Sequence, residues 1–188
     1  MPMALQLLPG TFTLDLYHRL GELGILDEDD RVELLDGQIV EMTPIGGAHS
    51  ACVIRLNDLL ARRVRRDTTV SVQNPVILAD RWEPQPDLAV LRRSGGLSGA
   101  WLPHAPDVLL VIEVADTSLE RDRTVKLPRY AAAGFSEAWL VDITSDRIEV
   151  HREPGPDGYR EVRLATRGAT ITPINLPGID INVDDVLG

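Results

Sequence analysis

Apolar residues recur along this chain with two different periods, and each period predicts a kind of element. Over residues 13–23 and 48–64 they return every three or four positions, which places them on one face of an α-helix. Gly24 follows the first of these segments and suits the end of a helix. The sequence therefore predicts an N-terminal helix and a second, longer one.

A third helix is expected somewhere between Ser118 and Ala133, where Gly134 closes the segment. Pro128 lies inside it, and proline cannot donate the hydrogen bond that a helix interior needs. Two arrangements are open. Either Pro128 kinks a continuous helix, or the regular part begins near Thr124 and holds Pro128 in its first turn.

Runs of β-prone residues separate these helices and predict strands. Asp36-Gly37 lies between two such runs within residues 31–42, a strong signal for a β-hairpin. Residues 108–112 are apolar without a break, as expected of a strand that is buried on both faces. Further strands are expected at residues 69–78, 87–91, 138–141, 147–151 and 159–164, with a loop over residues 94–106. The order of elements predicts a single α/β domain over residues 1–188, in which an N-terminal helix and a β-hairpin precede a central mixed β-sheet flanked by helices.

Composition narrows the class of protein. The chain has 188 residues, of which 44% are hydrophobic, enough for one domain with its own core. It has no run of 18 or more apolar residues, so no membrane span is expected, and residues 1–10 do not resemble a signal peptide. Cys52 is the only cysteine, which excludes an internal disulfide and a zinc site made of several thiolates. A cytoplasmic location is the prediction that follows.

The net charge of −10 argues against a nucleic acid as partner, because phosphates favour a positive surface. The charge is unevenly distributed, however. Residues 46–66 contain five arginines and only one acid, Asp58. The arginines are Arg55, Arg62, Arg63, Arg65 and Arg66. This segment predicts a local basic surface that can contact DNA; the alternative is a solvated helix end.

The apolar run over residues 108–112 leads directly into a carboxylate, Glu113. Burying an unpaired carboxylate costs several kcal/mol, so a cation is expected against Glu113: a metal ion, a lysine or an arginine. Asp87 begins the preceding strand, and if the two strands are antiparallel neighbours, Asp87 lies beside Glu113. Two converging carboxylates favour a divalent cation between them, and all-oxygen ligation suits Mg²⁺ or Mn²⁺ better than zinc.

Lys126 lies on the helix that follows the Glu113 strand. This helix must pack back across the sheet, so an ammonium on its inner face can stabilise charge on a phosphate or orient an attacking water. Plainer alternatives exist for all three residues. Asp87 can open a turn, Glu113 can pair with an arginine or a lysine, and Lys126 can be an exposed residue paired with Asp122.

These residues belong to a series of short motifs that runs along nearly the whole chain. The motifs are Gln85-Pro86-Asp87-Leu-Ala-Val, Val111-Ile-Glu113-Val-Ala-Asp-Thr-Ser118, Asp122 with Lys126, Tyr130-Ala-Ala-Ala-Gly134 and Trp139-Leu-Val-Asp142. Residues 32–44 and His49 precede them, and Leu176-Pro-Gly-Ile179 closes the series. In this order and spacing, over residues 11–187, the chain resembles the Uma2 family of restriction endonuclease-like proteins.

The resemblance implies a restriction-endonuclease-like core of the PD-(D/E)XK nuclease superfamily, with DNA as substrate and Mg²⁺ (or Mn²⁺) as cofactor. It maps the acids of the motif onto Asp87 and Glu113, as metal ligands, and the lysine onto Lys126. The superfamily pattern has this lysine two residues after the second acid, where this chain has Ala115. The ammonium is therefore expected to reach the same point in space from the next helix. Glu33 is implied as a further catalytic carboxylate that faces the same cavity.

The function implied is that of a metal-dependent endonuclease that hydrolyses DNA phosphodiester bonds. Two rivals stay open: a catalytically inactive DNA-binding or regulatory module on the same fold, and a structural α/β protein whose acids pair with arginines. Glu33 can equally be the solvent-facing member of an alternating strand. His49, Tyr130 and Trp139 are interpreted as structural or, for His49, as a surface residue. A homodimer is expected by analogy with nucleases that cut both strands.

Overall fold

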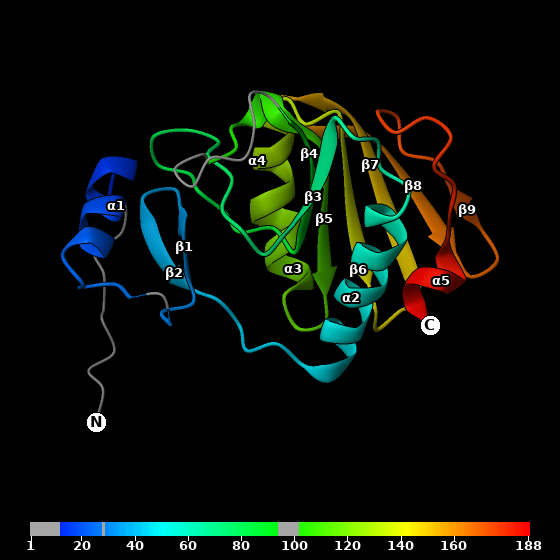
Figure 1. The fold of residues 1–188 in the computed structure, drawn as a ribbon, viewed down its shortest axis with the longest axis horizontal. Helices are drawn as coiled ribbons and strands as arrows, with labels where there is room; N and C mark the ends of the chain where they lie inside the picture. The colour runs from blue at the N-terminus through cyan, green and yellow to red at the C-terminus, as the bar shows by residue number, and fades with distance from the viewer. Residues whose placement is uncertain (1–11, 28, 94–101) are drawn as a thin grey trace.

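A six-stranded mixed β-sheet forms the centre of the protein, which is described here from a computed structural model covering residues 12–27, 29–93 and 102–188 (Figure 1). The strands are β3 (Thr68–Val72), β4 (Leu88–Arg92), β5 (Val108–Ala115), β6 (Glu137–Asp142), β7 (Arg147–Gly155) and β8 (Gly158–Thr166), and they lie side by side in this order. Strands β5 and β6 are parallel, and every other neighbouring pair is antiparallel. The predicted central mixed sheet is thus confirmed.

Helices cover both faces of this sheet. One face packs against α2 (Gly47–Ala61) and α5 (Val183–Leu187), and the other against α4 (Leu127–Ala132) (Figure 1). All eight residues of β5 are buried, and successive residues point to opposite faces. Leu110 and Ile112 join the core under α2, whereas Val111 and Ala115 join the core under α4. Glu113, two residues from each of the latter pair, therefore faces α4.

A helical crossover joins the parallel strands β5 and β6, as such a connection requires. It consists of α3 (Leu119–Arg121), a π-helical turn (Asp122–Lys126) and α4. Pro128 is the second residue of α4, directly after the π-helical turn, and the backbone stays helical from Leu119 to Ala132. The prediction of a continuous helix around Pro128 is therefore the one that the structure matches, with a π-helical turn before the proline, and the alternative of a regular helix that begins near Thr124 is wrong.

An N-terminal lobe, which we define as α1 (Leu14–Glu22) and the hairpin of β1 (Val32–Leu35) and β2 (Gln38–Glu41), lies at one side of the central sheet (Figure 1). Asp36 and Gly37 have φ angles of 51° and 73°, the left-handed conformation that a two-residue hairpin turn needs. The remaining elements are a 3₁₀ turn at Ala105–Asp107 and the short pair β9 (Thr170–Ile171) and β10 (Ile181–Asn182). The predicted helix and hairpin are confirmed.

Several strands differ in length from their predictions, and two of these differences bear on the site. Strand β3 ends at Val72 instead of residue 78, because Gln73 adopts a φ of 51° and Pro75 has no N–H to continue the ladder. Strand β5 extends beyond Ile112 to Ala115, since its partner β6 pairs with it as far as Ala115. The extension places Glu113 inside the sheet and not at its border.

Two predictions concern residues outside the described ranges. The prediction that residues 1–10 are not a signal peptide lies wholly outside them, and the loop predicted over residues 94–106 lies outside them at residues 94–101. Among the helices of the described ranges, none combines the length and the apolar character needed to span a membrane.

The buried centre of β5 should dominate the stability of the sheet. We expect Leu110→Ala to lower the free energy of unfolding by about 2–5 kcal/mol, because Leu110 is fully buried and its removal leaves a cavity. Leu164→Ala on β8 removes the same atoms from a residue that is 62% exposed. This substitution should change the free energy of unfolding by less than about 0.5 kcal/mol. Equal losses in urea unfolding would show that β5 is not the core strand.

Candidate active site

The antiparallel register of β4 and β5 brings two acids together at one end of the pair. Leu88 is paired with Ile112, so the preceding Asp87 lies opposite Glu113, and both side chains project from the same face of the sheet. A cavity of about 340 Å³ opens beside them and is lined by Asp87, Glu113 and Lys126. The structure thus places three of the four predicted site residues around one cavity.

Asp87 is held in place by nitrogen donors. Its Oδ2 accepts a hydrogen bond from the backbone N–H of Val114 (2.8 Å) and lies 3.1 Å from Nε2 of His49. Its Oδ1 accepts a bond from Nε2 of Gln73 (3.1 Å). Burial by itself would raise the pKa of Asp87, but these three contacts outweigh it and lower the pKa overall. Asp87 is therefore ionised at neutral pH.

Glu113 has the opposite environment. It is 2% exposed, and burial, assisted by the negative charges of Asp122 and Asp87, raises its pKa to about 8 against the opposing effect of Lys126. Its Oε1 accepts a hydrogen bond from the hydroxyl of Tyr130 (2.5 Å) and lies 3.3 Å from Nζ of Lys126. Both contacts fall on Oε1, which leaves Oε2 as the oxygen without a hydrogen bond from the described residues. A further cation at Oε2 would favour the ionised form.

Lys126 is a buried ammonium between two carboxylates. It is 3% exposed, and its Nζ lies 2.9 Å from Oε2 of Glu33 and 3.3 Å from Oε1 of Glu113. Burial lowers the pKa of Lys126, but Glu113, Glu33 and Asp122 together raise it above its ordinary value. Lys126 thus stays charged in a site where an isolated ammonium would lose its proton. The exposed surface lysine considered from the sequence is not what the structure shows.

Glu33 lies behind Lys126 and not at the cavity surface. It is completely buried, and its Oε2 also accepts a hydrogen bond from the backbone N–H of Gln85 (3.2 Å). The residues that line the cavity do not include Glu33. The solvent-facing alternative is excluded by this burial, and the expected cavity-facing carboxylate is instead the partner that fixes the ammonium.

Three residues of the site escaped the sequence interpretation. His49, expected to be structural or exposed, contacts Asp87, and Tyr130, expected to be core, donates its hydroxyl to Glu113. Asp122 is also buried and lines the cavity. Asp122, Lys126 and Tyr130 follow each other at intervals of four residues, a spacing that could have revealed their common face. No local signal marks His49, because its partner lies 38 residues away.

The arginine-rich segment lies away from the cavity. His49 is in the first turn of α2, whereas Arg62 caps its other end, about 20 Å further along the axis. Arg55 and Arg63 donate to backbone carbonyls near the C-terminus, while Arg62 and Arg65 pair with nearby aspartates. DNA contact by this segment stays a prediction and would be separate from the cavity.

The donor set fits a hard divalent ion bound with few protein ligands. Among the described residues, no three His, Cys, Asp or Glu side chains are grouped closely enough to hold an ion by themselves. Mg²⁺ does not need such a group, because it keeps several waters and binds one or two carboxylates together with substrate phosphates. Asp87, ionised, and Glu113, with one oxygen unbonded, match this requirement.

Removing the ammonium should expose the cost of the buried charges. We expect Lys126→Met to lower the free energy of unfolding by about 3–5 kcal/mol, because Glu33 and Glu113 stay buried without a cation. Adding Glu33→Gln should recover part of this loss. Arg62→Met breaks the exposed pair with Asp58 and should cost less than about 1 kcal/mol. Urea unfolding of the four proteins in chelator measures all three changes.

Glu113 also predicts a pH dependence for the protein freed of divalent ions. The pKa of Glu113 is about 8 in the folded protein against 4.5 in the unfolded chain, so the folded state holds this proton more tightly. The unfolding free energy should therefore fall as the pH rises from 4.5 towards 8. Glu113→Gln should flatten this part of the profile in urea unfolding. Parallel profiles for the two proteins would contradict the assignment.

Comparison with known proteins agrees with this architecture. No curated protein sequence matches the chain. The crystal structure of a "putative nuclease belonging to DUF820" from Anabaena variabilis ATCC 29413 is similar, with a TM-score of 0.76 at 17% sequence identity, over 94% of this chain and 97% of that one. This similarity confirms the expected nuclease-like fold. The Uma2 family, described as "Putative restriction endonuclease", matches residues 14–184, and the chain belongs to this family.

Proposed function

We propose that the chain is a metal-dependent endonuclease that hydrolyses DNA phosphodiester bonds, built as one nuclease-like domain over residues 1–188. The observation that carries the proposal is the meeting of Asp87, Glu113 and the Lys126 ammonium at one cavity. Two acids from neighbouring strands can hold a divalent ion, and the buried ammonium beside them can stabilise negative charge on a phosphodiester. Membership of a family described as restriction endonucleases supports the same class of reaction.

Asp87 and Glu113 are the residues that would hold Mg²⁺ or Mn²⁺. Such an ion, when bound, lowers the pKa of a coordinated water and polarises the scissile phosphate. Glu113 presents its Oε2 for this purpose, because Tyr130 and Lys126 occupy Oε1. His49 and Gln73 fix the rotamer of Asp87, so its carboxylate is oriented before any ligand arrives.

Lys126 stabilises the negative charge that develops on the phosphate. Its ammonium is preorganised, since Glu33 and Glu113 hold it from two sides and burial keeps bulk water away. Glu33 is a positioning residue in this mechanism, because it is fully buried and acts through Lys126.

The catalytically inactive DNA-binding or regulatory module stays as the rival function, and the net charge of −10 favours its regulatory form over one that binds DNA. The inactive module predicts no DNA cleavage with or without divalent ions, whereas the endonuclease predicts cleavage that requires them. A cytoplasmic location and a homodimer remain predictions of the proposal.

Two variants should separate metal binding from turnover. Glu113→Gln removes a ligand charge at nearly constant shape, so Mn²⁺ affinity by calorimetry and DNA cleavage should both fall. Lys126→Ala should leave Mn²⁺ binding intact or slightly tighter, because a repelling cation is gone. Its cleavage rate should nevertheless drop by roughly 10²-fold or more, the scale for one preorganised charge.

The thermal midpoint of each variant controls for misfolding, which matters most for the buried Lys126. Where Lys126→Ala is unfolded, the double variant with Glu33→Gln keeps the comparison, because it removes one of the carboxylates left unpaired. Cleavage by a folded Lys126 variant at the wild-type rate would exclude the lysine from the mechanism. Cleavage that persists in chelator would exclude the metal.

A further inference from the structure

Arg121 lines the same cavity as Asp87 and Lys126, yet none of the described residues accepts a hydrogen bond from its Nε. Its Nε is buried and without a hydrogen-bond partner, and no ion pair joins its guanidinium to any carboxylate of the described residues. Leaving a buried donor unsatisfied costs free energy, more so when the group is charged. The Arg121 side chain is therefore positioned to donate a hydrogen bond to a ligand that enters the cavity.

Comparable arginines sharpen this observation. Arg147 and Arg152 also have a buried Nε without a partner, but each bonds a carboxylate through another nitrogen, at 3.1 Å to Asp142 and 3.0 Å to Glu137. Arg121 makes no such second contact within the described part of the chain. Burial raises the pKa of the adjacent Asp122, and the positive charge of Arg121 opposes this rise.

The other arginines of the crossover are already engaged. Arg123 donates two hydrogen bonds to Glu149, and Arg129 lies over the ring of Trp82, 4.8 Å from its centroid. Lys126 is held by its two carboxylates. Of the cations on α3, the π-helical turn and α4, only Arg121 both faces the cavity and lacks a protein acceptor among the described residues.

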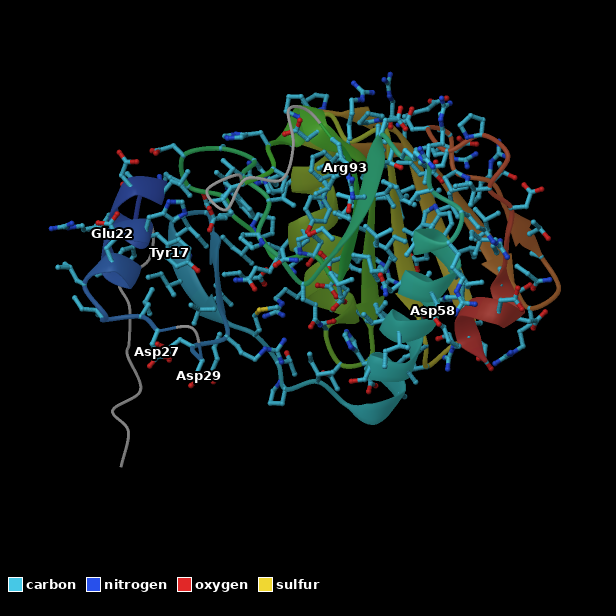
Figure 2. All side chains as sticks on the ribbon, viewed as in Figure 1. Tyr17, Glu22, Asp27, Asp29, Asp58 and Arg93 are labelled. Carbon is cyan, nitrogen blue, oxygen red and sulfur yellow. The ribbon has the colours of Figure 1, made fainter. Side chains whose placement is uncertain are left out.

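Two hollows adjoin the cavity, and their charges differ, so they are not equally suitable for a polyanion that extends beyond the cavity. Towards α1 and the loop that follows it, the cavity adjoins a larger hollow of about 980 Å³, where one arginine, Arg31, faces four acids: Glu22, Asp27, Asp29 and Asp30. Figure 2 shows Glu22, Asp27 and Asp29 on α1 and the loop that follows it. Phosphates would be repelled there.

Towards the hairpin turn and α4, Arg121 lies on the border between the cavity and a hollow of about 590 Å³. Arg129 and Trp82 also line that hollow, and its two acids, Asp36 and Asp157, are balanced by its two arginines. This side accepts a polyanion more readily than the acidic side does.

We propose that Arg121 binds a backbone phosphate next to the scissile one, so that the nucleic-acid strand leaves the cavity over Arg121 and away from the acidic hollow. The ligand class is a phosphodiester of the substrate strand, because a guanidinium matches phosphate oxygens with two parallel hydrogen bonds. The inference rests on the proposed function, which supplies the substrate, and adds the residue and the direction of the strand. Arg121 is thus a substrate-binding residue that belongs to no recognised motif of the chain.

The test is DNA binding without cleavage, measured by fluorescence anisotropy of a labelled 20-bp duplex in Ca²⁺ at several salt concentrations. Loss of one phosphate contact should weaken binding by Arg121→Gln about tenfold at low salt and reduce the slope of log K against log salt by about 0.9. Arg121→Lys keeps the charge and should retain the slope with a smaller loss of affinity. The matched control is Arg163→Gln, an exposed arginine on β8 that is paired with Val150 on the sheet face opposite the crossover, and it should behave like the wild type.

The outcomes distinguish this inference from the proposed function. A wild-type protein that binds no DNA at low salt overturns both. Wild-type binding with an unchanged slope in Arg121→Gln overturns the Arg121 assignment alone, as does an equal change in Arg163→Gln, which would indicate a general effect of net charge. The thermal midpoint of Arg121→Gln should equal or exceed that of the wild type, because a buried Nε–H without an acceptor is removed. A large decrease instead would assign Arg121 to the fold.

Discussion

The buried ammonium of Lys126 joins three separate parts of the chain. Glu33 comes from the N-terminal hairpin, Glu113 from the central strand β5, and Lys126 from the crossover helix. None of these charges could be buried alone without a penalty of several kcal/mol, so each requires the others. The lobe, the sheet and the crossover are therefore held in register by the same charges that form the candidate site.

The sheet determines which residues can take part in that cluster. Because β4 and β5 are antiparallel, Asp87 and Glu113 share one face, and because β5 and β6 are parallel, a helical connection must return across that face. The π-helical turn at Asp122–Lys126 lies where this connection passes the acids. Turns of this kind occur often at functional sites, where they reorient side chains at some cost in hydrogen-bond geometry.

An acidic protein can still act on a polyanion if its charges are segregated. Around the hollow beside α1, four acids face one arginine, whereas the cavity sets three cations, Arg31, Arg121 and Lys126, against its four acids. A divalent ion held by Asp87 and Glu113 would make the local charge at the cavity more positive. The net charge of −10 is therefore a poor guide to the field at the site itself.

The sequence by itself predicted most of the elements and, on the condition that their strands are antiparallel neighbours, the meeting of Asp87 with Glu113. The register of β4 and β5 supplied that condition. The sequence also determined that a cation had to meet Glu113. Only the tertiary structure decided that Glu33 lies behind Lys126, since a strand's alternation does not say what covers each face. Nor could the sequence single out Arg121 among the arginines of the crossover. A π-helical turn bonds residues five apart, so it brings Arg121 to the cavity beside Lys126, whereas a helical wheel with a period of 3.6 residues places these two side chains on different faces.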